Sequence, residues 1–228
     1  MTDLPSFYRR AGFVTGIMLD QNSVAGMLSA SDRLHQEAAD MINSDGDFNL
    51  EAHEGGFRGQ KSDGVGTLPA VLRKVSNVVA HSAAADAISK RADLQRLAAT
   101  LTNAGSVELA HSILWCKPPG VGSPKPPHQD AAYLDGEPDR YVTFWIALDH
   151  CDRDNGCLQV VPGSHQQDYF HSGAEPQVAP EVWSCLPVMD VPLNSGWAAV
   201  FHPRLLHASA ANISSRPRRA LMLRYVAR

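Results

Sequence analysis

The second half of the chain carries the pattern that most limits what it can fold into. From residue 106 onward, short runs rich in β-branched and aromatic residues are separated by Pro and Gly, with no helical stretch between them. Many short strands with turn signals are typical of a sandwiched or closed antiparallel sheet. The runs expected to form strands are 107–116, 141–149, 157–161, 185–191, 197–202 and 219–226.

The first half has a different pattern, because its apolar residues recur at helical spacing. A first helix is predicted over about 24–42, with Asp20 or Ser23 available as its N-cap. A second helix is predicted over 68–79, where the apolar residues form an i, i+3, i+4, i+7 stripe. A third is expected to cover part of 83–102.

The length of the chain limits the number of domains that it is expected to form. Its 228 residues suit one domain and are enough to bury a substantial interior. We therefore expect a single domain, mainly β with a helical N-terminal half. Residues 1–105 would form a mainly helical support region, and residues 106–228 would hold most of the sheet core.

The composition limits which classes of partner the protein is expected to bind. The net charge of -4 argues against nucleic acid, because phosphate binding normally shows a basic excess. No apolar run approaches the roughly twenty residues of a membrane helix, and residues 1–10 lack an apolar signal core. Cys116, Cys151, Cys157 and Cys185 form no Cys-x-x-Cys pair, which favours buried thiols. We expect a cytoplasmic monomer or small homo-oligomer that binds neither nucleic acid nor membrane.

The tripeptide His128-Gln129-Asp130 is the strongest chemical signal. Residues two apart in an extended segment point to the same side, so His128 and Asp130 can face one ion while Gln129 points away. A second imidazole would complete the two-histidine, one-carboxylate set that binds ferrous iron and leaves positions open. His202 and His207 are both candidates, and their opposite strand parity means that a regular strand turns only one of them inward.

Several short stretches around these histidines occur in one order over residues 107–228, about half of the chain. They are Lys117-Pro118-Pro119, Pro127-His128-Gln129-Asp130 with Tyr133, Trp145-Ile146-Ala147-Leu148, Asn155-Gly156-Cys157-Leu158, Pro162-Gly163-Ser164-His165, Phe201-His202-Pro203, His207-Ala208-Ser209 and Arg218-Arg219-Ala220. In this order they resemble the phytanoyl-CoA hydroxylase (PhyH)-like family of iron(II)/2-oxoglutarate dioxygenases. The resemblance implies a double-stranded β-helix, a jelly-roll barrel flanked by helices, with its site inside one mouth.

The resemblance also implies a ligand set. His128, Asp130 and His207 would bind Fe(2+), and His207 is selected over His202 by the residues that follow it. Arg218 would bind the distal carboxylate of 2-oxoglutarate, because a guanidinium can donate two parallel hydrogen bonds to that group.

Further residues could contact the co-substrate. Ser209 has the strand parity of the last iron ligand, and its hydroxyl could reach the same carboxylate; a turn-capping role is the alternative. Trp145 and Ile113 fall where the family places pocket contacts, although both would also suit a sheet core. For Arg73 and Lys74 a solvated helix face is the favoured interpretation, and a second basic contact to the co-substrate by either is the alternative.

The reaction that the resemblance implies uses Fe(2+), 2-oxoglutarate and O2 to hydroxylate a C–H bond of a small-molecule metabolite, giving succinate and CO2. Asp130 favours oxygenation, because related halogenases lack this carboxylate; desaturation, epoxidation and cyclisation stay open. Residues 45–66 and 163–184 are the expected lids, and Tyr133 could reach the substrate. The competing hypothesis is a metal-binding jelly roll without oxygenase activity, either a cupin-type isomerase or a small-molecule-binding protein, which has no need of Arg218.

Overall fold

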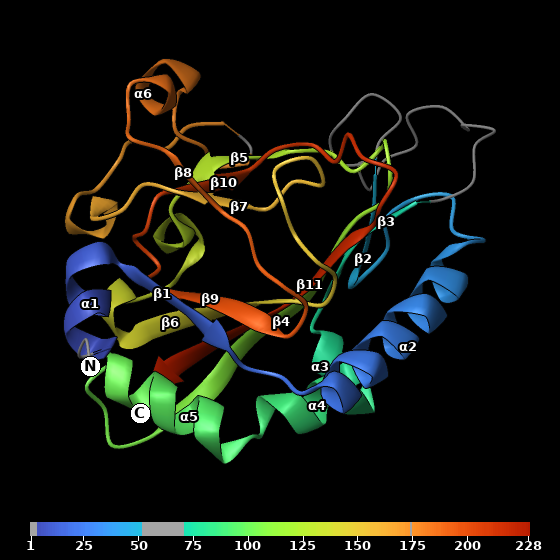
Figure 1. Ribbon diagram of the computed structural model, residues 1–228, viewed down its shortest axis with the longest axis horizontal. Coiled ribbons are helices and arrows are strands. Elements are labelled where there is room, and N and C mark those ends of the chain that lie inside the picture. The colour runs from blue at the N-terminus through green and yellow to red at the C-terminus, as the bar shows by residue number, and fades with distance from the viewer. Residues whose placement is uncertain (1–3, 52–70, 174) are drawn as a thin grey trace.

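Two antiparallel sheets form the body of the protein, and helices cover one outer face (Figure 1). The computed structural model describes residues 4–51, 71–173 and 175–228. The strands are β1 Phe13–Ile17, β2 Phe48–Leu50, β3 Leu72–Ser76, β4 Val107–Lys117, β5 Lys125–His128, β6 Tyr141–Ala147, β7 Leu158–Val160, β8 Met189–Val191, β9 Trp197–Phe201, β10 His207–Ser209 and β11 Arg218–Ala227. The helices are α1 Leu4–Ala11, α2 Gln21–Ala38, α3 Val78–His81, α4 Ala83–Ser89, α5 Ala92–Leu101 and α6 Pro180–Ser184, with 3-10 turns η1 Asp130–Tyr133, η2 Pro138–Arg140 and η3 Ser164–Gln166.

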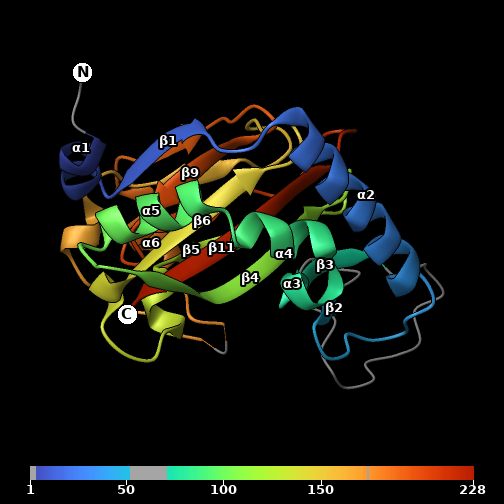
Figure 2. The same ribbon diagram turned by 90° about the horizontal axis from the view of Figure 1, so that it is seen from below.

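The sheets pack face to face. The larger has the strand order β1-β9-β6-β11-β4-β3-β2, and the smaller has the order β5-β10-β7-β8. In Figure 1 the smaller sheet lies above the larger one, and Figure 2 shows α2, α4 and α5 across the outer face of the larger sheet. This is the jelly-roll, double-stranded β-helix arrangement that the resemblance implied, and the predicted fold class is confirmed.

Side chains along β11 point alternately into two different hydrophobic cores. Leu221 packs in the core between the larger sheet and the helices, whereas Ala220 and Met222 pack in the core between the sheets. Arg218 and Arg224 share the parity of Ala220 and Met222, so this strand carries two buried arginines toward the inner face.

The predicted first and third helices correspond to real elements. The helix expected over 24–42 is α2, and Asp20 is its N-cap, accepting a hydrogen bond of 2.8 Å from the Ser23 backbone N–H. The helix expected within 83–102 is two helices, α4 and α5, because the chain leaves helical geometry near Lys90.

The helix expected over 68–79 is wrong where the structure describes it. Strand β3 occupies most of this stretch, and the short helix α3 only follows it. Val75 pairs with Leu114 of β4 and is fully buried, so pairing with the sheet overrides the helical spacing of the apolar residues. Residues 68–70 lie outside the described residues.

All six runs expected to form strands contain one, although β8 fills only the end of 185–191. Strands β1, β2, β5 and β10 were not predicted. Pro126 and Pro127 lie within β5, and proline cannot donate to a sheet ladder, which makes a strand hard to recognise there. Strand β10 has only 3 residues, too few to show a period.

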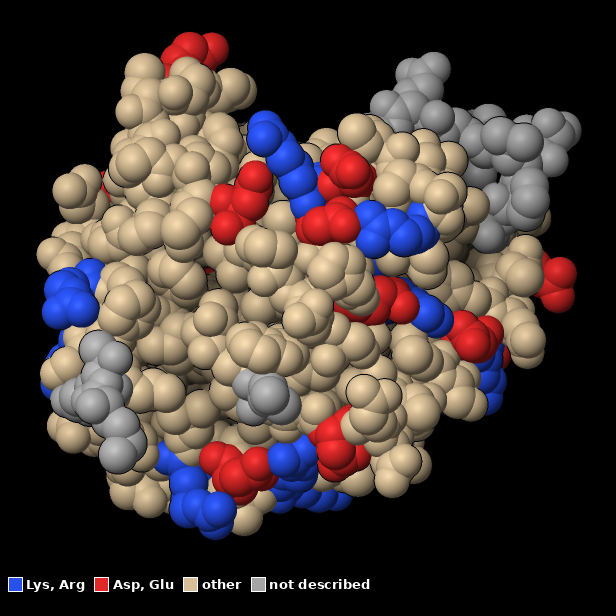
Figure 3. All heavy atoms as spheres, in the orientation of Figure 1, with Lys and Arg blue, Asp and Glu red and all other residues tan. Residues whose placement is uncertain are grey.

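The structure also shows which cysteines are buried, whether a helix could cross a membrane, and how charges are distributed on one face. Cys116, Cys151 and Cys157 are buried as predicted, whereas Cys185 is exposed, which corrects that expectation. In the described part of the chain, no helix has both the length and the apolar character needed to cross a membrane. On the face shown in Figure 3, Lys and Arg are interspersed with Asp and Glu.

Candidate functional site

The three predicted metal ligands meet between the sheets. His128 ends β5, Asp130 begins η1, and His207 begins β10, where it lies opposite His128 in the strand pairing. Asp130 Oδ1 lies 3.6 Å from His128 Nε2 and 3.9 Å from His207 Nε2. One ligand atom from each residue can be chosen so that all lie within 4.8 Å of one another, and all three residues are buried.

Backbone carbonyls orient both imidazoles. His128 Nδ1 lies 2.8 Å from the Pro126 carbonyl oxygen, and His207 Nδ1 lies 2.9 Å from the Leu205 carbonyl oxygen. A carbonyl only accepts hydrogen bonds, so each Nδ1 carries a proton, and Nε2 is the ring nitrogen directed toward Asp130. Burial, together with the nearby His128, lowers the pKa of His207 to about 3, so its ring is neutral, as metal binding requires.

Asp130 is held as a carboxylate. Burial alone raises its pKa, but the positive charge of Arg224, followed by the contacts with His128 and His207, more than offsets this, and its pKa lies well below the usual value. Arg224 forms an ion pair with Asp130 Oδ2, and the Thr143 hydroxyl donates to the same oxygen over 3.3 Å. The site therefore offers two imidazoles, of which that of His207 is neutral, and one anionic oxygen donor.

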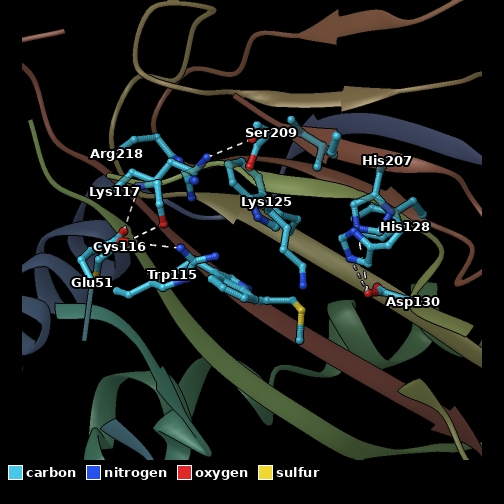
Figure 4. A pocket seen from close by; sticks show the side chains of 17 residues that line it. Glu51, Trp115, Cys116, Lys117, Lys125, His128, Asp130, His207, Ser209 and Arg218 are labelled. Carbon is cyan, nitrogen blue, oxygen red and sulfur yellow. Dashed lines mark hydrogen bonds and ion pairs between the residues drawn. The ribbon is translucent and has the colours of Figure 1, made fainter. Parts of the chain in front are cut away.

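A pocket of about 560 Å³, including space open to solvent, extends from these ligands. Figure 4 shows His128, Asp130 and His207 at one end and Arg218 at the other. Arg218 is 3 % exposed, its guanidinium lies 5.3 Å from the centre of the Trp145 ring, and burial lowers its pKa.

Arg218 has hydrogen-bonding capacity to spare. Its Nε is buried and has no hydrogen-bond partner among the described residues. A buried guanidinium is costly unless an anion balances it. Its neighbour Arg219 points away and donates to Asp149 over 2.8 Å on the other face of the strand.

Of the other residues predicted to contact the co-substrate, some line the pocket and others lie outside it. Ser209 and Trp145 line the pocket with Arg218. Ile113 pairs with Met222 across the sheet and packs against the inner core, and it is not among the described residues that line the pocket. Arg73 and Lys74 lie on β3 rather than on a helix, so the solvated helix face is wrong for both.

Sequence reasoning gave no definite role to the basic and acidic groups around Arg218. Arg73 is buried, lines the pocket and pairs with Glu51 over 3.3 Å. Lys117 stands opposite Arg218 in the strand pairing and donates to the Ser209 carbonyl oxygen over 3.2 Å. Burial lowers the pKa of Lys117 well below its usual value. Arg73 was missed because a helix was predicted over 68–79, where the structure has strand β3. Glu51 belongs to no recognisable sequence motif.

The predicted lid at 163–184 lies beside the predicted metal ligands where it is described. Gln129 points away from the ligand set and toward this segment: its side chain donates to the Gln167 carbonyl oxygen over 2.7 Å and accepts from the Tyr169 N–H over 3.0 Å. The Gln129 N–H also donates to His171 Nε2 over 2.9 Å. Most of the lid predicted at 45–66 falls outside the described residues.

Tyr133 and Lys125 also join this segment. Tyr133 is 42 % exposed, its ring meets the His128 ring edge-on, and its hydroxyl donates to the Pro176 carbonyl oxygen over 3.0 Å. Lys125 lines the pocket and forms an ion pair with Glu175. The segment is therefore bonded to both sides of the metal-ligand tripeptide.

Known proteins resemble this chain at the level of sequence. The family described as phytanoyl-CoA dioxygenase (PhyH) matches residues 8–220. Phytanoyl-CoA dioxygenase 1 of Oryza sativa subsp. japonica is 34% identical over 116 residues, which are 48% of this chain and 41% of the relative. The chain thus spans about two fifths of the length of the curated relatives it matches.

Solved structures share the fold over nearly the whole chain. AviO1 from Streptomyces viridochromogenes Tue57 has a TM-score of 0.75 and 26% identity, and the match covers 98% of this chain and 93% of that one. The epimerase SnoN, solved in complex with Fe3+, alpha ketoglutarate and nogalamycin RO, has a TM-score of 0.76 and 25% identity, with 98% and 82% covered.

Proposed function

The chain belongs to the phytanoyl-CoA dioxygenase (PhyH) family, and from this premise we propose that it is a non-haem iron(II)- and 2-oxoglutarate-dependent dioxygenase. One observation carries the proposal. Two imidazoles and one carboxylate converge in a buried pocket whose other end holds a buried guanidinium with an unpartnered Nε. A metal set and an anion-binding group in one pocket suit a co-substrate that is both a chelator and a dicarboxylate.

The residues present fit both groups. Two imidazole nitrogens and a carboxylate oxygen form the donor set that non-haem iron(II) oxygenases use. Arg218 offers the planar fork that matches a carboxylate. The structure of SnoN, which is 25% identical, was solved with Fe3+ and alpha ketoglutarate, and this supports the same pair of groups for the present chain.

Iron(II) together with 2-oxoglutarate supplies, when bound, oxygen activation coupled to loss of CO2 from the co-substrate, leaving succinate. His128, Asp130 and His207 hold the metal, and their hydrogen bonds to the protein fix the direction of each donor. Arg218 binds the distal carboxylate, and Trp145 covers the guanidinium. The side chains of His128, Asp130, His207 and Arg218 are buried, and the low dielectric of such surroundings strengthens these electrostatic contacts.

The proposed reaction is hydroxylation of a C–H bond in a small-molecule metabolite. The substrate would approach from the side of the segment 167–178, because this segment adjoins the metal ligands through Gln129. Related folds serve other outcomes: SnoK is named a carbocyclase and SnoN an epimerase. Asp130 favours oxygenation over halide binding at the metal.

Succinate release tests the proposal. The purified chain, loaded anaerobically with ferrous iron and 2-oxoglutarate and then exposed to O2, should form succinate slowly alone and faster with its substrate from a metabolite library. Asp130→Ala should abolish this release. Metal binding without any binding of 2-oxoglutarate would overturn the proposal in favour of a metal-binding jelly roll without oxygenase activity.

A further inference from the structure

The two oxygens of Asp130 have different surroundings. Oδ1 faces the imidazole nitrogens, 3.6 Å from His128 Nε2 and 3.9 Å from His207 Nε2. Oδ2 faces away from them, accepts from the Thr143 hydroxyl over 3.3 Å and pairs with Arg224. One oxygen is presented toward the metal-ligand set, and the other is already occupied by protein.

Arg224 and Thr143 form a closed unit with that oxygen. Arg224 Nε donates to the Thr143 hydroxyl oxygen over 3.0 Å, while its other end pairs with Asp130. Arg224 lies opposite Thr143 in the β11–β6 pairing, so the backbone fixes the distance between them. Arg224 is 5 % exposed and Thr143 is fully buried, which removes water as a competing partner for Oδ2.

We propose that Arg224 is a positioning residue for the metal centre, which with Thr143 occupies Asp130 Oδ2 so that the carboxylate ligates through Oδ1 alone. This inference rests on the proposed function, because it concerns a bound divalent metal. Carboxylates ligate metals through one oxygen or two. Arg224 decides between these modes by holding the second oxygen in a charge-assisted hydrogen bond.

The number of oxygens matters because positions at the metal are limited. Three protein donors leave three open positions on a six-coordinate metal, two for a chelating 2-oxo acid and one for O2. A carboxylate that ligates through both oxygens would take one of these positions. Arg224 therefore preserves room for the co-substrate without touching it.

Co2+ is a suitable probe, because it replaces ferrous iron without reacting with O2 and its visible spectrum reports coordination. We compare Arg224→Met with Arg219→Met, since Arg219 lies on the same strand but pairs with Asp149 on the other face. In Arg224→Met, Co2+ should bind within about threefold of the unaltered chain, while 2-oxoglutarate binds the Co2+-loaded protein about tenfold more weakly. Arg219→Met should change neither affinity, and Arg224→Lys should restore most of the 2-oxoglutarate affinity.

Thr143→Val provides a second test if Arg224→Met fails to fold. It removes one partner of Oδ2 and keeps the ion pair, so 2-oxoglutarate binding should weaken in the same direction but less, with a parallel change in the Co2+ spectrum. Unchanged 2-oxoglutarate affinity in both variants would overturn the inference alone. Equal losses of Co2+ affinity in Arg224→Met and Arg219→Met would overturn it too, because they indicate general destabilisation. A chain that binds no Co2+ at all would overturn both this inference and the proposed function.

Discussion

At the scale of single residues, Arg218 is distinguished by a buried guanidinium whose Nε has no hydrogen-bond partner among the described residues. The residue opposite it in the strand pairing is Lys117, which offers no carboxylate to balance the guanidinium. A residue kept in this state is stabilised when an anion binds beside it.

Arg218→Ala should weaken 2-oxoglutarate binding by about tenfold to a hundredfold, the equivalent of one charge-assisted contact. Metal content should stay near normal, because Arg218 lies at the other end of the pocket from the ligands. Calorimetric titration of 2-oxoglutarate into Co2+-loaded protein measures the change. Arg216→Ala is the matched control, since Arg216 pairs with Asp152 at the surface. Unaltered affinity in Arg218→Ala would show that another group binds the co-substrate.

His202, the rival that was not selected as a ligand, has a separate role in stability. It lies away from the metal-ligand set, with its Nε2 3.4 Å from Asp139, and accepts from the Arg204 N–H over 3.1 Å. Burial lowers its pKa to about 4, against about 6.5 in an unfolded chain. The folded state therefore binds fewer protons than the unfolded state between these values, and this contribution to stability is lost as the pH falls from about 6.5 toward 4.

His202→Asn should reduce the dependence of unfolding free energy on pH in that range, because the amide oxygen keeps an acceptor and does not titrate. Urea unfolding of both proteins at pH 7, 6 and 5 measures the slope. An unchanged slope would mean that other groups, such as His207, account for the acid sensitivity.

The residues of the site differ in how far the sequence could predict them. His128 and Asp130 share a local spacing that geometry alone explains, while His207 and Arg218 needed the ordered resemblance to be singled out. Arg224 and Thr143 could not be found, because what defines them is a contact with Asp130 that only strand pairing creates. Their roles toward iron and 2-oxoglutarate stay predictions.

At the scale of elements, the short strand β5 and the turn that follows it connect the metal ligands to the segment 167–178. Gln129 makes three hydrogen bonds to that segment, with Gln167, Tyr169 and His171, and donates a fourth to the Arg204 carbonyl oxygen. It is 2 % exposed, so losing these bonds would leave buried polar groups unpaired.

Gln129→Ala should loosen this segment without removing a ligand. The Tyr169 amide loses its acceptor, so its hydrogen exchange should accelerate about tenfold, which corresponds to roughly one hydrogen bond. Hydrogen-exchange mass spectrometry over 165–173 measures this, with Co2+ affinity followed in parallel. Gln166→Ala, at an exposed position in the same segment, should leave exchange unchanged. Slow exchange retained in Gln129→Ala would contradict the coupling.

Element prediction succeeded where local pattern and tertiary environment agree. Strands β4, β6 and β11 show long β-type runs, and α2 shows both its period and its cap. Strand β3 was mistaken for a helix, because Leu72, Val75 and Val78 recur every three residues and all are buried in one core. The stretch forms a strand because it pairs with β4, and β4 lies too far along the chain for a local pattern to reveal the pairing.

At the scale of the whole molecule, the N-terminal region is a structural part of the barrel as well as a support. Strand β1 pairs with β9, and β3 pairs with β4, so both complete the larger sheet. The core beneath the helices combines Met27 and Leu34 of α2 with Leu114 and Leu221 of the sheet. The second half alone would expose that core to water.

A fragment of residues 106–228 should therefore fail to fold cooperatively, because the larger sheet loses the strands that flank it on both sides and one of its two faces becomes uncovered. Circular dichroism with thermal melting of the fragment and the full chain tests this expectation. A cooperative transition in the fragment would show that the two regions are independent domains rather than the single domain predicted from length.

The alternation along β11 has an evolutionary consequence. Deleting one codon between Arg218 and Arg224 would reverse the facing of the residues beyond the deletion, sending Arg224 toward the apolar core under the helices and Leu223 toward the space between the sheets. The described part of the stretch 163–184 contains no long strand, so a change in its length reverses no alternating pattern of side chains. Among descendants of this chain, gains and losses of single codons should therefore be tolerated more often in that stretch than within 218–227.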